Sequence, residues 1–106
     1  MTPECADVPV ACSLDEAALG VRTEEWRALV ATSVTAVEHD ATTVRLVLRD
    51  SDVALTAAAA LAQREKQCCA FFDVSIVLEA DRRTLVLAVP DGAEEALAAF
   101  VTLLSA

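Results

Sequence analysis

The order of hydrophobic and polar residues along the chain predicts four strands and three helices. Apolar residues alternate with polar ones in two pairs of short stretches, which is typical of half-buried strands joined by turns. The first hairpin is expected within 34–48 with its turn at 39–42, and the second within 74–89 with its turn at 81–83. A Pro-Asp-Gly stretch at 90–92 then ends the last strand.

Three further segments have the spacing or composition of helices. The Ser-Leu-Asp-Glu stretch at 13–16 has the form of a capping box, so a first helix is expected to run from Ser13 towards Ser33. Gly20 and the cap-like Thr23 suggest a break or kink near its middle, which leaves two short helices as an alternative. The other two helices are expected at 53–69, in an Ala-rich stretch, and at 94–104.

These elements follow one another in the order α-β-β-α-β-β-α, in which two β-β-α units, 34–62 and 74–104, can be aligned. The natural packing for this order is an α+β fold, a four-stranded antiparallel sheet with helices packed on one face. A chain of 106 residues forms one domain, which we expect to span 13–106. Residues 1–12 contain two prolines and are expected to form an irregular N-terminal segment.

Charge and hydropathy narrow the choice of partners. The chain has 8 basic and 17 acidic residues, and the formal net charge of −9 disfavours nucleic acids and anionic lipids, which bind through Lys and Arg. No apolar run approaches the roughly 18–20 residues of a membrane-spanning helix, and the N-terminus lacks the basic start and apolar stretch of a signal peptide. We therefore expect a cytoplasmic protein, with no membrane partner, whose four cysteines are thiols.

Cys68 and Cys69 carry the distinctive chemistry of this chain. A disulfide between adjacent cysteines closes a strained ring, so a bridge within the pair is not expected. At a helix end their side chains point about 100° apart, so the plainer interpretation is one buried cysteine with a coincidental neighbour. A metal site needs a third thiol, and Cys12 lies directly before the predicted first helix. If that helix and the helix at 53–69 pack antiparallel, Cys12 approaches the pair.

Three thiolates suit a soft metal or metalloid ion. Hg(II), As(III), Pb(II) and Cu(I) accept two or three sulfur ligands, whereas Zn(II) needs a fourth ligand, which Glu65, Cys5 or His39 could supply. Glu65 lies one turn before the pair on the same helix face, where it could ligate a metal, hydrogen-bond a thiol or accept a proton. The plainer interpretation of Glu65 is a solvated carboxylate paired with Lys66 or Arg64. These two cations would also favour thiolate formation.

The remaining candidates have structural interpretations. Trp26 and the Phe71-Phe72 pair have the spacing of core residues and are expected to shield the cysteines from water. Arg22, four residues before Trp26, is expected to stack on its ring or to form a salt bridge with a strand. His39 is the only histidine and is interpreted as a solvated turn residue, so no Ser/His/Asp or Cys/His arrangement can be built and no catalytic residue is assigned.

Three stretches of the chain form a distinctive combination, which comprises Cys12-Ser13-Leu14, Arg22 with Trp26, and Glu65-x-x-Cys68-Cys69-x-Phe71. This combination resembles a small bacterial domain found in short actinobacterial proteins and joined to metal-responsive regulators of the mercury-resistance (MerR) type. The resemblance extends from about residue 12 to 104, and its most specific part is the E-x-x-C-C-x-F stretch. It implies a thiol-based metal or metalloid role for Cys12, Cys68 and Cys69. Because the chain has no winged helix, it implies no regulator function that binds DNA.

We therefore expect a protein that buffers, delivers or senses a soft ion (Hg, As, Cu or Zn) through Cys12, Cys68 and Cys69, assisted by Glu65, with Cys5 as an optional extra ligand. One alternative is a small thiol-dependent enzyme of the reductase or carbon–metal lyase type. Another is an interaction domain that dimerises through a strand edge or helix face and has structural cysteines. The partners are then the metal ion and, as open alternatives, a second copy in a homodimer or a regulator protein.

Overall fold

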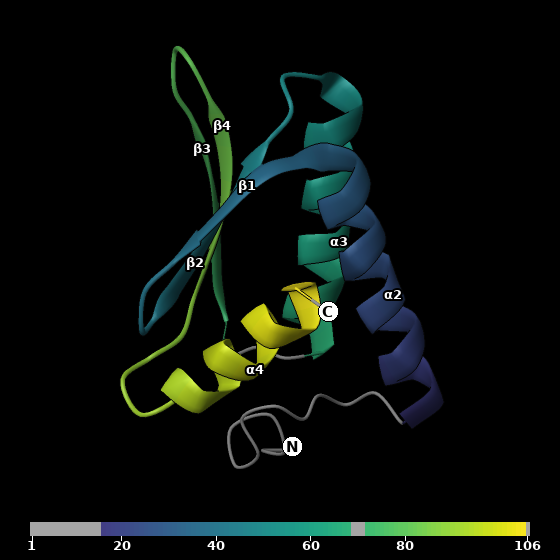
Figure 1. The fold of residues 1–106 in the computed structure, drawn as a ribbon, viewed down its shortest axis with the longest axis vertical. Helices are drawn as coiled ribbons and strands as arrows, with labels where there is room; N and C mark the ends of the chain where they lie inside the picture. The colour runs from purple at the N-terminus through teal and green to yellow at the C-terminus, as the bar shows by residue number, and fades with distance from the viewer. Residues whose placement is uncertain (1–15, 69–71, 106) are drawn as a thin grey trace.

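The computed structural model of the chain describes residues 16–68 and 72–105, which form a layer of helices on one face of an antiparallel sheet (Figure 1). The elements in chain order are α2 (Glu16–Ser33), β1 (Val34–His39), β2 (Thr43–Leu48), α3 (Asp52–Cys68), β3 (Asp73–Leu78), β4 (Arg83–Ala88) and α4 (Glu94–Ser105). This order confirms the predicted α+β fold with its α-β-β-α-β-β-α arrangement. The irregular segment predicted for 1–12 lies outside the described residues.

The second strand of each hairpin lies in the middle of the sheet. The strand order is β1-β2-β4-β3, and every neighbouring pair is antiparallel. In the central pair, Val44 lies opposite Leu87 and Leu46 lies opposite Leu85, and all four side chains are fully buried. Their helix-facing positions alternate with more exposed ones, as the period of two in the sequence predicted. The first strand of each hairpin therefore forms an edge of the sheet.

Each helix that follows a hairpin packs mainly on the other hairpin. The helix α3 follows β1 and β2 but makes its main sheet contacts with β3 and β4, whereas α4 follows β3 and β4 and contacts β2. The helix α2 packs against α3, α4 and β1. The two β-β-α units that can be aligned in the sequence are therefore interlocked, so neither unit buries its own apolar face without the other. No helix within 16–68 or 72–105 has the length and apolar character to cross a membrane.

The helix α2 is continuous, which corrects the break expected near Gly20. It runs through this glycine from Glu16 to Ser33. A glycine in a helix interior costs only about 1 kcal/mol, and the burial of Trp26 and Leu29 farther along the same helix more than offsets it. Ser13, the first residue of the expected capping box, lies outside the described residues.

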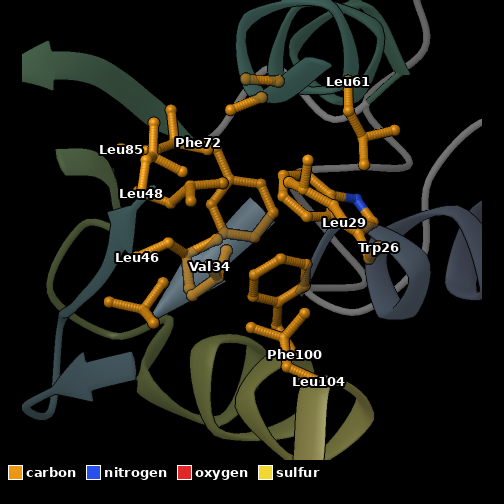
Figure 2. Packing of buried hydrophobic residues seen from close by; sticks show 14 of the residues in the cluster. Trp26, Leu29, Val34, Leu46, Leu48, Leu61, Phe72, Leu85, Phe100 and Leu104 are labelled. Carbon is orange, nitrogen blue, oxygen red and sulfur yellow. The ribbon is translucent and has the colours of Figure 1, made fainter. Parts of the chain in front are cut away.

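Three aromatic rings form the centre of the core between the sheet and the helices (Figure 2). The ring of Phe100, on α4, packs against both of the others. Its centroid is 5.1 Å from that of Trp26, with an interplanar angle of 87°, and 5.7 Å from that of Phe72. These are favourable edge-to-face and tilted geometries. Because Trp26 belongs to α2 and Phe72 directly precedes β3, the rings connect two helices with the sheet.

The first hairpin turns at Asp40, and its geometry corrects the expectation for His39. His39 is the last residue of β1 and is exposed, rather than part of the turn. The Oδ1 atom of Asp40 accepts hydrogen bonds from the backbone N–H groups of Thr42 (3.0 Å) and Thr43 (2.9 Å). These bonds, led by that of Thr42, hold the pKa of Asp40 below its usual value of 3.8, with nearby Arg45 adding to the effect.

A pair of valines tests the position of the core. Val44→Ala removes two methyl groups from a fully buried site, so we expect it to lower the free energy of unfolding by about 2–3 kcal/mol. Val53→Ala makes the same change where the side chain is 77% exposed and should change the stability by less than about 0.5 kcal/mol. Urea unfolding of the reduced protein measures both. Equal losses in the two variants would contradict the assigned core.

Candidate functional site

A buried carboxylate joins α2 to the last part of α3. Glu65 is only 6% exposed, and its Oε1 atom accepts a hydrogen bond from Trp26 Nε1 at 2.9 Å. The same oxygen accepts a second hydrogen bond from Arg22 Nη1 at 3.2 Å, which is also an ion pair. Both donors lie on α2, about forty residues away along the chain. Glu65 therefore fixes how the two helices lie against each other.

A second acid and a second base extend this contact towards the surface. Glu25 on α2 pairs with Arg22 at 3.4 Å (Oε1 to Nε) and with Arg64 on α3 at 3.0 Å (Oε2 to Nη1). Acids and bases thus alternate across the helix pair from the buried Glu65 to the half-exposed Arg64. Exposed ion pairs contribute little, whereas removing one partner of a buried pair is costly, so the network is most sensitive to change at the Glu65 end.

The burial of Glu65 overturns one expectation from the sequence. The plainer interpretation, a solvated carboxylate paired with Lys66 or Arg64, is wrong, since Glu65 is buried and its ion pair is with Arg22. A carboxylate is buried at tolerable cost only when it is paired and hydrogen-bonded. Within the described residues, no buried side-chain nitrogen or oxygen lacks a hydrogen-bond partner. The salt bridge expected between Arg22 and a strand is made with α3 instead.

The two helices run antiparallel, as the sequence analysis required for a three-thiol site. Arg22 and Glu25 lie in the first part of α2, and their partners Glu65 and Arg64 lie in the last part of α3. The start of α2 therefore lies beside the end of α3. Cys68 is the last residue of α3.

The chain on both sides of the two adjacent cysteines is held by the aromatic core. On the α3 side, the carboxylate of Glu65 accepts a hydrogen bond from the indole N–H of Trp26. On the β3 side, Phe72 is buried and packs on Phe100, which in turn packs on Trp26. Figure 2 shows the three rings facing one another. Glu65 and Phe72 are thus seven residues apart in the sequence and are joined through Trp26 and Phe100.

The structure describes some of the predicted site residues and not others. Cys5, Cys12 and Cys69 lie outside the described residues, and only the backbone of Cys68 is described. Within 16–68 and 72–105, no group of three or more His, Cys, Asp or Glu side chains could hold a metal ion. His39 lines a groove between the first hairpin turn and α4. The three-thiolate cluster therefore stays a prediction.

Sequence reasoning missed the connection between Trp26 and Glu65. Trp26 was expected to be buried, and it is, but its indole N–H is also the donor that helps to bury a carboxylate. A usable signal was the spacing of Arg22, Glu25 and Trp26 on one helix face, which indicates a polar contact beside an apolar one. The partner of that face could not be read from spacing alone.

No protein-family model, curated protein or solved structure matches this chain.

A double-mutant cycle tests the buried contact. We expect Arg22→Met and Glu65→Gln to be coupled by about 1–3 kcal/mol in the free energy of unfolding, because Arg22→Met leaves the carboxylate of Glu65 buried without this ion-pair partner. Arg27 and Glu24 offer a matched exposed pair on the same helix, also at 3.2 Å. The cycle of Arg27→Met with Glu24→Gln should give less than about 0.5 kcal/mol. Equal coupling energies in the two cycles would show that the buried Glu65 ion pair contributes no more to the stability than the exposed pair does.

Proposed function

We propose that this protein binds a soft metal or metalloid ion through the thiolates of Cys12, Cys68 and Cys69, and so buffers, delivers or senses that ion. The observation that carries the proposal is the position of the two adjacent cysteines in the chain. They lie between Glu65 and Phe72, which are both held by the same buried aromatic cluster.

Such flanking contacts favour metal binding for two physical reasons. A chain held on both sides of its ligands has less conformational freedom to lose when the ligands close around an ion. Apolar groups beside a metal site also limit the access of water, which strengthens the interaction between thiolate and ion. Phe72 and Trp26 are the described residues that supply this apolar surrounding.

The antiparallel packing of α2 and α3 supports Cys12 as the third ligand. Going back from Arg22, α2 extends to Glu16, six residues or about 9 Å along its axis. Going forward from Glu65, α3 extends to Cys68, three residues or about 4.5 Å in the same direction. Cys12 precedes Glu16 by four residues, and four residues can span up to about 14 Å. This chain length supports the proposal that Cys12 is the third ligand.

We assign Glu65 an assisting role rather than that of a principal ligand. Its Oε1 atom already accepts two hydrogen bonds, from Trp26 and Arg22, and a metal ion at that oxygen would compete with both donors. In this role Glu65 positions the end of α3, where Cys68 is the last residue of the helix and Cys69 comes next in the sequence. Three thiolates without a fourth ligand favour Hg(II), As(III) or Cu(I) over Zn(II), unless Cys5 completes a tetrahedral site.

The electrostatics of the chain are compatible with a cationic ligand. The formal net charge of −9 raises the local concentration of cations. The end of α3, where the thiol pair begins, is the negative end of a helix dipole and therefore stabilises a bound cation.

A metal titration followed at Trp26 tests the proposed function. Trp26 is the only tryptophan and is bonded to Glu65, one turn before Cys68, so a heavy ion bound there should quench its fluorescence. We expect the reduced protein to bind one equivalent of Hg(II), As(III) or Cu(I), with sulfur-to-metal absorbance and a matching intact mass. Cys68→Ser with Cys69→Ser should weaken binding about 100-fold or more, since even changes outside the ligand set cost 10–100-fold.

Two further variants make the titration specific. Gln63→Ser with Gln67→Ser places two serines on an exposed part of α3 without removing a thiol, and it should bind as the wild type does. Cys12→Ser should weaken As(III) binding, because As(III) prefers three thiolates. Weak binding of every ion, unchanged in the Cys68/Cys69 double variant, would refute the metal site. If one cysteine then reacted far faster than the others with an alkylating reagent, the thiol-enzyme alternative would replace it.

A further inference from the structure

The two edges of the sheet differ in how they are protected. The strands β1 and β3 each pair with only one neighbour in the described sheet, so each has backbone N–H and C=O groups along its outer side. An unprotected edge of this kind is a template for pairing with another strand. Proteins usually protect such edges with charged side chains, proline, bulges or short strand length.

The edge formed by β1 has two of these protections. Glu38 lies on this strand, and its Oε1 atom is paired with Arg45 at 3.7 Å and with Arg82 at 3.3 Å. The strand itself therefore carries one charged side chain, that of Glu38. The pairing of β1 with β2 is also irregular between Val34 and Ala36, which disturbs the edge near its start.

The edge formed by β3 has none of these protections along 74–78. The five residues of this stretch, Val-Ser-Ile-Val-Leu, include no charge and no proline, and the strand pairs with β4 in an unbroken register. Ile76 is 37% exposed, Val77 41% and Leu78 64%. Because neighbouring side chains on a strand point to opposite faces, apolar groups are exposed on both faces. Figure 1 shows the turn of the β3–β4 hairpin apart from the helices, although α3 contacts both strands of this hairpin.

We propose that β3 pairs antiparallel with β3 of a second copy of this chain, which joins two four-stranded sheets into one continuous sheet. An antiparallel pair of identical strands is related by a two-fold axis, so each copy presents the same surface to the other. The exposed apolar side chains of one strand then lie beside those of the partner strand on both faces. A second copy would therefore pair with the outer backbone groups of β3, which no other described strand contacts, and would cover Ile76, Val77 and Leu78 in one step.

The charges near β3 are compatible with this arrangement. Asp73 starts the strand, the β3–β4 turn beyond its end contains Glu79, Asp81 and Arg82, and Arg83 begins β4. In an antiparallel pair, the start of one strand lies near the turn of the other, so Asp73 approaches a region where acids and bases balance. The formal net charge of −9 on each copy still opposes association. Added salt should therefore strengthen the dimer.

The size of the contact predicts a weak dimer. The strand β3 has six residues, and pairing of one short strand covers less than the roughly 800 Å² per partner of a standard stable interface. We expect a dissociation constant in the micromolar range, about 10–100 μM. The protein would then be monomeric when dilute and dimeric when concentrated.

Sedimentation at several concentrations tests this proposal. The full chain is measured from about 5 to 500 μM, a range that brackets the expected dissociation constant. The buffer contains a reductant and a chelator, so that neither disulfides nor metal ions can join two copies. Val77→Lys should weaken the dimer about tenfold or more, because an edge lysine must be desolvated on pairing. Val77→Thr keeps strand propensity while adding a polar group, and it should weaken the dimer less.

A matched control lies on the opposite edge. Val37→Lys on β1 changes a valine of similar exposure, 38%, and should leave the dimer unchanged. Circular dichroism shows whether each variant is folded. The proposal would be overturned if the wild type stayed monomeric throughout the concentration range. It would also be overturned if Val37→Lys weakened the dimer and Val77→Lys did not. Because metal is excluded, the result is independent of the proposed thiol site.

Discussion

The contact on which the rest of the structure depends is the pair of hydrogen bonds that the Glu65 carboxylate accepts from Trp26 and Arg22. A buried carboxylate without these donors would be costly, so α2 has one favourable placement along α3. That placement puts the Trp26 ring against Phe100 of α4, and Phe100 in turn packs on Phe72 at the start of β3. The polar contact joins α2 to α3, and the aromatic packing connects both of them to α4 and the sheet.

The interlocked halves explain why the polar contact and the core act together. Since α3 packs on β3 and β4, and α4 packs on β2, each hairpin needs the helix of the other unit to bury its apolar face. The same topology places β2 and β4 in the centre of the sheet and leaves β1 and β3 at its edges. The charged side chain of Glu38 on β1 has no counterpart along 74–78 of β3, so the two halves resemble each other in outline but differ in the surfaces they expose.

The proposed metal site depends on this core rather than on a separate framework. Cys68 and Cys69 follow the helix turn that Glu65 fixes and precede the phenylalanine that the core buries. A change in the Trp26 or Glu65 contacts should therefore reach the thiols through the backbone alone. This arrangement also makes Trp26 a natural reporter of events at the cysteines, because the ring bonds to Glu65 one turn before them.

The sequence by itself determined the elements and their order, because strand and helix periodicity are local properties of neighbouring side chains. It also placed Glu65 one turn before the thiol pair, since the spacing of three and four residues is that of a helix face. Only the tertiary structure decided that α2 is continuous through Gly20, that Glu65 is buried, and that β1 and β3 form the edges of the described sheet. These outcomes depend on residues far apart in the chain, such as Arg22 and Glu65. The free energy of burying such pairs arises only when the fold brings them together.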